Sequence, residues 1–208
     1  MSVFVTFEGI EGSGKSTHVR LLAEAMRARG LAILETHEPG DTAVGQALRQ
    51  VLLDPANATL TPLTELLLYC ADRSQHVAEC VRPALAAGRL VLCDRFSDST
   101  IAYQGYGRGL DLALVRRLDA SARDGLMPSL TLLFDCPAQE GLARARRRST
   151  AGDRLESAPL AFHERVRDGF LQLAGETPER YVVIDSRAPL AAVQSRVAEA
   201  VARRLEAT

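Results

Sequence analysis

A glycine-rich segment near the start of the sequence has the spacing of a phosphate-binding loop. It fits the pattern GxxxxGKS and consists of Gly9, Ile10, Glu11, Gly12, Ser13, Gly14, Lys15, Ser16 and Thr17. Glycines let successive backbone N–H groups surround a phosphate, and the N-terminus of a following helix adds partial positive charge. We expect Lys15 to reach the β- and γ-phosphates and the Ser16 hydroxyl to bind Mg²⁺. The segment therefore predicts binding of a nucleoside triphosphate.

An acidic and a basic residue stand together further along the chain, at Asp94 and Arg95. They close an apolar run that is typical of a buried strand, so we expect them near the phosphate-binding loop. Asp94 can hold Mg²⁺ directly or through water, and the guanidinium of Arg95 can bind a second phosphate through two parallel hydrogen bonds. A buried structural ion pair is the alternative interpretation of this dipeptide.

Arginines gather in the C-terminal half of the chain. Four of them, Arg144, Arg146, Arg147 and Arg148, end a predicted helix, and Arg154 follows. Phosphoryl transfer spreads negative charge over the moving group, which a guanidinium on a closing loop can neutralise. We therefore expect a short arginine-rich lid at about residues 144–159. The alternative is a solvated helix end with favourable dipole placement.

Tyr69 and Arg73 are four residues apart on a predicted helix and so share a face. An aromatic ring and a guanidinium together suit a planar base, through stacking and hydrogen bonding. A half-buried tyrosine beside an exposed arginine is the alternative interpretation. A loop-like stretch after Arg95 offers further hydroxyl and amide groups for a base edge and a sugar, at Ser99, Thr100, Tyr103 and Gln104.

The hydrophobic pattern shows which elements must position these residues. Apolar runs rich in β-branched residues predict buried parallel strands over residues 3–8, 32–36, 89–94, 130–135 and 180–185. Helical periodicity covers residues 15–29, 43–53, 63–87, 112–123, 138–148, 159–174 and 190–205. The alternation predicts an α/β fold in one domain over residues 1–208, a doubly wound five-stranded parallel sheet flanked by helices. Ligands bind such sheets beyond the carboxyl ends of the strands, where the candidate residues stand.

Composition limits the classes of function. The 25 basic and 26 acidic residues give a net charge of −1, so no global field favours nucleic acid or an anionic membrane. No apolar run approaches a membrane span, and no secretory signal opens the chain, so we expect a cytoplasmic protein. Neither the cysteines nor the histidines show metal spacing, and we assign no chemistry to His18, His37, His76 and His163.

Taken together, the motifs resemble those of bacterial thymidylate kinases. The matching segments read FEGIEGSGKST at residues 7–17, EPG at 38–40, DR at 72–73, DRF at 94–96, ST at 99–100, AYQG at 102–105 and DRLE at 153–156. The resemblance implies a P-loop kinase fold, a homodimer, and transfer of phosphate from ATP to dTMP with Mg²⁺. The clearest departure is at residues 37–41, where the family sequence REPGG reads HEPGD.

The resemblance also implies roles for individual residues. Lys15 and the rest of the loop would bind the ATP phosphates, and Glu11 would lie near Mg²⁺ and the acceptor sugar. Arg95 would hold the dTMP phosphate, while Arg148 and Arg154 match the lid arginines of the family. The thymidine part of the acceptor would be contacted by Glu38, Pro39, Tyr69, Arg73, Ser99, Thr100, Tyr103 and Gln104.

Three other functions are compatible with a phosphate-binding loop. A GTPase switch generally recognises guanine with a lysine-containing motif. Lys15 is the single lysine of this chain and belongs to the phosphate-binding loop, so a GTPase is disfavoured. A kinase for another nucleoside monophosphate stays open because specificity is a difference of binding energies. A catalytically silent nucleotide-binding protein is disfavoured by the intact Lys15, Ser16, Asp94 and Arg95.

Overall fold

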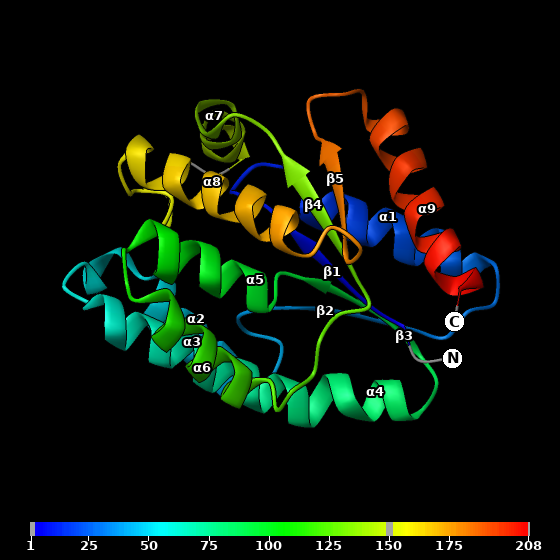
Figure 1. Cartoon of the computed structure of the whole chain (residues 1–208), viewed down its shortest axis with the longest axis horizontal. Helices are drawn as coiled ribbons and strands as arrows, with labels where there is room; N and C mark the ends of the chain where they lie inside the picture. The colour runs from blue at the N-terminus through cyan, green and yellow to red at the C-terminus, as the bar shows by residue number, and fades with distance from the viewer. Residues whose placement is uncertain (1–2, 149–151, 208) are drawn as a thin grey trace.

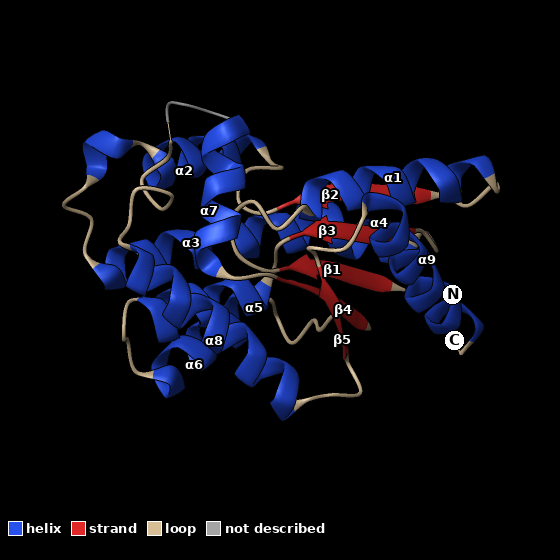
Figure 2. Ribbon diagram, turned by 90° about the horizontal axis from the view of Figure 1, so that it is seen from above, coloured by secondary structure: helices blue, strands red, loops and turns tan. Residues whose placement is uncertain are grey.

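The computed structural model describes residues 3–148 and 152–207, apart from the side chain of Arg148. Its centre is a sheet of five parallel strands in the order β2-β3-β1-β4-β5 (Figure 2). The strands are β1 (Phe4–Glu8), β2 (Ile33–His37), β3 (Leu90–Asp94), β4 (Leu130–Asp135) and β5 (Tyr181–Asp185). This confirms the predicted α/β sheet, and each strand lies within one residue of its predicted bounds.

The central strands are apolar along their length because helices cover both faces of the sheet. All five residues of β1 are buried, with Val5 and Phe7 packed on one face and Phe4 on the other. On the first face, α1 (Lys15–Ala28) and α9 (Leu190–Glu206) lie side by side (Figure 1). On the opposite face, α8 (Leu160–Glu176) packs against β4 and β5, and α4 (Arg82–Ala86) packs against β3. Among the described residues, no helix is both long and apolar enough to cross a bilayer.

The other helices follow the predicted periodicity, with one local change. They are α2 (Ala43–Leu53), α3 (Pro62–His76), α4 (Arg82–Ala86), α6 (Leu112–Ala122), α7 (Ala138–Arg148) and α8 (Leu160–Glu176). The single helix predicted over residues 63–87 comprises α3, the π-helical turn η2 (Val77–Val81) and α4. Pro83 lies just after the widened turn, and a proline has no N–H to continue the regular α-helical hydrogen bonds.

The prediction of a loop after Arg95 is wrong, because the chain is helical there. It forms α5 (Ser97–Thr100) and the π-helical segment η3 (Ile101–Gly107). This segment is buried on almost every side, so it lacks the polar face by which a surface helix is recognised. Its glycines allow the tight packing, because a Cβ on Gly107 would lie 2.7 Å from the Phe162 ring.

The strand register brings the candidate residues to one edge of the sheet. Phe7 of β1 and His37 of β2 are both aligned with Asp94 of β3. The backbone N–H of Glu38 also donates to the Asp94 carbonyl at 3.0 Å. The segments that follow β1, β2 and β3 therefore lie next to one another, where a bound ligand would meet all three.

Candidate active site

The loop between β1 and α1 wraps around the ammonium group of Lys15. Lys15 Nζ donates hydrogen bonds to the carbonyls of Gly9 at 3.0 Å and Ile10 at 2.8 Å, and lies 3.3 Å from Ser13 Oγ. The side chain is buried. Burial, together with the nearby charge of Arg95, lowers the pKa of Lys15 to about 8. A phosphate anion that replaces these carbonyl contacts would favour the charged lysine.

Two positions of this loop accept only glycine because other backbone approaches them. A Cβ on Gly9 would lie 2.4 Å from the carbonyl oxygen of Phe134, and a Cβ on Gly12 would lie 2.0 Å from that of Gly141. Gly9 and Gly12 also have φ angles of 136° and 69°, which disfavour other residues. The contact is reciprocal, since a Cβ on Gly141 would lie 2.5 Å from the Glu11 carbonyl. Helix α7 is therefore in direct backbone contact with the phosphate-binding loop.

Ser16 and Asp94 lie together at the end of the loop, with the Ser16 hydroxyl donating to Asp94 Oδ2. A hydroxyl and a carboxylate supply the hard oxygen ligands that Mg²⁺ prefers. Within residues 3–148 and 152–207, no group of three or more His, Cys, Asp and Glu side chains could hold a metal ion. The pair therefore fits a Mg²⁺ ion that takes its remaining ligands from water and a nucleotide.

Arg95 is held in an unusual backbone conformation at the end of β3. Its φ is 70°, in the left-handed region that few non-glycine residues adopt. The turn is secured on both sides, because Arg95 N–H donates to the Phe7 carbonyl at 3.0 Å and Phe96 N–H donates to Glu8 Oε1 at 2.8 Å. Such conformations persist where the surroundings determine them, often at functional sites. The guanidinium donates to the Gly9 carbonyl at 2.9 Å and so lies beside the loop.

Glu11 is a buried carboxylate close to the positive charges of Lys15 and Arg95. Its Oε1 accepts hydrogen bonds from Arg95 Nη2 at 3.2 Å and from the Tyr103 hydroxyl. Its Oε2 lies 3.3 Å from Nδ1 of His163. Burial alone would raise the pKa of Glu11, but the contact with His163 and the charges of Arg95 and Lys15 hold that pKa well below its usual range. Glu11 is therefore an anion that the surrounding donors hold in place.

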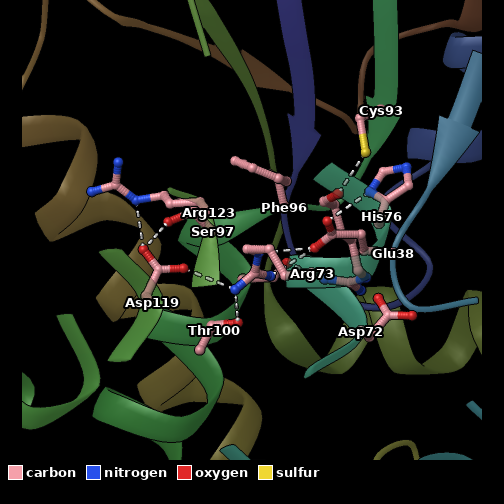
Figure 3. A network of polar contacts seen from close by, with 12 residues as sticks. Glu38, Asp72, Arg73, His76, Cys93, Phe96, Ser97, Thr100, Asp119 and Arg123 are labelled. Atoms are coloured by element: carbon pink, nitrogen blue, oxygen red, sulfur yellow. Dashed lines mark hydrogen bonds and ion pairs between the residues drawn. The ribbon is translucent and has the colours of Figure 1, made fainter. Parts of the chain in front are cut away.

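Arg73 is the centre of a second buried network (Figure 3). Arg73 is 1% exposed, and its guanidinium donates to Glu38 Oε2 at 2.9 Å, to Thr100 Oγ1 at 2.8 Å and to Asp119 Oδ1 at 2.8 Å. The residues of this network come from α3, from α5, from α6 and from the segment that follows β2. Several elements therefore hold one guanidinium in place. It also includes His76, whose Nδ1 lies 2.8 Å from Glu38 Oε1.

The two networks face a common cavity of about 570 Å³. Of the residues predicted from the sequence, those that line it are Glu11, Gly12, Gly14, Lys15, Ser16, Thr17, Glu38, Pro39, Tyr69, Arg73, Asp94, Arg95, Ser99, Thr100, Tyr103 and Gln104. Its wall does not include Gly9, Ile10, Ser13 or Arg154. The arrangement can therefore hold two phosphate groups close together and a flat ring system beside them.

Comparison with known proteins assigns the family. A family model described as Thymidylate kinase matches residues 7–197. The chain is 52% identical over 208 residues to a thymidylate kinase of Trichlorobacter lovleyi, covering 98% of each. It is 53% identical over 193 residues to one of Desulfovibrio desulfuricans, covering 90% of this chain and 89% of that relative. The chain belongs to the thymidylate kinase family. It also resembles the crystal structure of thymidylate kinase from Ehrlichia chaffeensis, with a TM-score of 0.79, 35% identity, and coverage of 96% of this chain and 98% of that one.

The lid arginines expected from the thymidylate kinase motifs have different outcomes. Arg154 lies against Glu65 of α3, with Nη1 2.5 Å from Oε2. Its Nε donates to the Leu52 carbonyl at 2.8 Å. The side chain of Arg148 lies outside the described residues, as do Ser149 and residues 150–151. The transition-state role expected of either arginine stays a prediction.

Sequence reasoning missed three buried residues that support this thymidylate kinase site. Glu8 accepts hydrogen bonds from Phe96 N–H and from the Ser99 hydroxyl, at 2.8 and 2.6 Å. Glu65 receives Arg108 as well as Arg154. His163 faces Glu11. Glu8 stands inside the motif FEG and could have been found there, whereas nothing local marks the other two.

Proposed function

We propose that this chain transfers the γ-phosphoryl group of ATP to the phosphate of dTMP. The observation that carries this proposal is the shared cavity, in which Lys15 of the phosphate-binding loop and Arg95 stand near Tyr69 and Arg73. Two sites for phosphate and one for a base are what a nucleoside monophosphate kinase requires. The relatives named thymidylate kinase, which match nearly the whole chain, support dTMP as the acceptor.

In this mechanism the loop and its lysine hold the donor. The β- and γ-phosphates of ATP would take the place of the carbonyls that now accept from Lys15 Nζ. Arg95 would hold the acceptor phosphate, from a turn that its neighbours already secure. A phosphate oxygen is a competent nucleophile, so positioning and electrostatic stabilisation suffice and no strong base is required. An arginine of the lid, Arg148 or Arg154, would add positive charge over the moving group.

Ser16 and Asp94 would hold Mg²⁺ in this reaction. When bound, the ion would neutralise charge that develops on the donor phosphates. Lys15 would bind the donor phosphates and Arg95 would bind the acceptor phosphate, on either side of the transferred group. The arrangement leaves Glu11 to orient Arg95 and Tyr103 rather than to remove a proton.

The base and sugar would occupy the part of the cavity lined by Tyr69, Arg73, Thr100 and Tyr103. The Tyr69 ring would stack on thymine, and Arg73 and Thr100 would face its polar edge. The Tyr103 ring packs against the Arg95 guanidinium, whose central carbon Cζ lies 5.1 Å from the ring centroid. The Tyr103 hydroxyl donates a hydrogen bond to Glu11. A rigid ring in this position would meet a ribose 2′-hydroxyl and so favour a deoxyribose.

Steady-state ADP release with Mg·ATP tests the proposal against a panel of dTMP, dUMP, dCMP, UMP, CMP, AMP and GMP. We expect fast turnover with dTMP and weak turnover with the ribonucleotides. Turnover with a different acceptor would keep the kinase and refute the assignment of the pocket. ATP binding without turnover on any acceptor would support a silent nucleotide-binding protein instead.

We also propose that two copies of the chain pair through α2 and α3, and that the protein acts in the cytoplasm. These helices pack together and carry large apolar side chains that are 42–50% exposed, at Val44, Val51, Leu63 and Leu67. Isolated exposed apolar residues are common, but a group of four on adjacent helices is typical of an interface. Light scattering should report a dimer for the wild type and a monomer for the double variant Val51→Glu, Leu67→Glu.

A further inference from the structure

His163 is a polar residue in an apolar setting. It lies on α8, shortly after the expected lid, and its side chain is completely buried. Its ring packs edge-on against Phe162, with centroids 5.2 Å apart. Neither ring nitrogen makes an aligned hydrogen bond within the described part of the chain. A buried imidazole without hydrogen bonds lowers the stability of the folded protein, so its presence here calls for an explanation.

The one acidic side chain within ion-pair distance of this ring, among the described residues, is Glu11, with Nδ1 3.3 Å from Oε2. That oxygen makes no hydrogen bond within the described residues, whereas Oε1 receives both Arg95 and Tyr103. The two carboxylate oxygens therefore face different partners. His163 faces one, and the residues expected at the acceptor phosphate and sugar share the other.

This division limits how tightly Glu11 can bind Arg95. A carboxylate that turns both oxygens to a guanidinium forms a bidentate pair, which is stronger than a single contact. Such a pair would occupy the N–H groups that the acceptor phosphate needs. With Oε2 attracted to His163, the Arg95 contact stays single, at 3.2 Å.

We propose that His163 is a positioning residue, which holds Glu11 so that Arg95 stays available to the acceptor phosphate. The proposal rests on the proposed function, in which Arg95 binds that phosphate. Because a carboxylate only accepts, the proposed contact assigns a proton to Nδ1. Because His163 would act on binding of the acceptor, its substitution should change binding of dTMP and leave binding of ATP nearly unchanged.

Kinetics of two variants test this role. His163→Phe fits the aromatic surroundings but removes the donor, so we expect the KM for dTMP to rise at least tenfold and the KM for ATP to change less than threefold. His163→Asn keeps a donor near the position of Nδ1, and we expect its KM for dTMP within threefold of wild type. A KM for dTMP within twofold of wild type in His163→Phe would overturn the proposal.

A double-mutant cycle with Glu11→Gln separates this role from packing. An amide cannot form the bidentate ionic pair, so in that background His163→Phe should change the KM for dTMP less than twofold. An equally large effect in both backgrounds would show that the histidine acts through packing, and would overturn the proposal.

A spectroscopic measurement keeps this test apart from the proposed activity. We expect the ¹⁵N signals of the His163 ring to change in Glu11→Gln and to stay unchanged in Glu164→Gln, an exposed neighbour on the same helix. Unchanged signals in Glu11→Gln would refute the contact itself. Failure of the wild type to phosphorylate dTMP, with the signals behaving as expected, would instead refute the assigned acceptor.

Discussion

Arg154 Nη1 lies 2.5 Å from Glu65 Oε2, so the segment after α7 is joined to helix α3 by a buried ion pair. A backbone hydrogen bond joins the same segment to α2, since Arg154 N–H donates to the Leu53 carbonyl at 3.0 Å. Glu65 is completely buried and also binds Arg108 and Gln104. The second half of the predicted lid is therefore anchored on α2 and α3, and α3 carries Tyr69 and Arg73 of the cavity wall.

Removing either partner should loosen this anchor. We expect amide hydrogen exchange over residues 152–158 to become at least tenfold faster in Arg154→Ala and in Glu65→Gln, a loss of about 1.4 kcal/mol in local stability. The matched control, Glu164→Gln, should exchange like the wild type. Unchanged exchange in both variants would mean that the ion pair contributes nothing to holding this segment.

Lys15 and Arg95 should each be required for turnover. Losing an electrostatic stabiliser of about 3 kcal/mol lowers a rate by a few hundredfold, so we expect at least that loss of kcat in Lys15→Ala and Arg95→Ala. Arg20→Ala is the control, because Arg20 lies on the exposed side of α1 and its ion pair within the described part of the chain is with Glu24. A loss below tenfold in both variants would refute the assigned roles.

Arg73 should matter for both stability and acceptor binding. Arg73→Ala removes the guanidinium that pairs with the buried carboxylates of Glu38 and Asp119, which keep only His76 and Arg123 as ion-pair partners among the described residues, and we expect the free energy of unfolding to fall by about 3 to 5 kcal/mol. Arg73→Lys keeps the charge and loses the planar fork, so it should fold better. We expect both variants to raise the KM for dTMP more than they lower kcat. Urea titrations and acceptor kinetics check the two effects separately.

Asp72 should make stability depend on pH. Burial and the nearby Glu38 charge raise its pKa to about 6 from the ordinary value of 3.8, and its Oδ2 has no hydrogen-bond partner within the described residues. Between these values the folded state binds the proton and the unfolded state does not, so the contribution of Asp72 to stability falls as the pH rises.

Asp72→Asn removes this titration and keeps an oxygen for the Gly40 N–H, which now donates to Asp72 Oδ1 at 3.0 Å. Relative to wild type, the variant should gain about 2 to 3 kcal/mol of unfolding free energy between pH 4 and pH 7. Urea titrations at several pH values measure the difference. A difference that stays constant with pH would contradict the raised pKa.

The backbone contact between α7 and the phosphate-binding loop should be sensitive to a single methyl group. A Cβ on Gly141 would lie 2.5 Å from the Glu11 carbonyl and 2.9 Å from Ile10 Cδ1, so Gly141→Ala must displace the loop. We expect a KM for ATP at least fivefold higher and a loss of about 1 to 3 kcal/mol in stability. Gly175→Ala on α8, where a Cβ meets nothing within 4 Å, should keep the wild-type KM for ATP.

Local patterns were sufficient to predict the scaffold and the phosphate chemistry. The strands are recognisable because burial on both faces requires continuous apolar runs, as in β1 and β3. The phosphate-binding loop is recognisable because its glycines, lysine and hydroxyl must occupy adjacent positions in the chain. Asp94 and Arg95 were placed correctly beside this loop because parallel strands present their carboxyl ends at one edge.

Contacts between distant segments could not be read in the same way. The helical stretch from Ser97 to Gly107 shows no periodicity, because its burial on nearly every side removes the polar face. Arg154 has the same sequence neighbours whether it reaches a nucleotide or Glu65, which is 89 positions away. His163 faces Glu11 only because α8 packs against the loop after β1. The sequence by itself determined the fold class, the phosphate-binding loop and the types of side chain at the site. Only the tertiary structure decided which buried charges face one another, because their pairing depends on how the helices pack on the sheet.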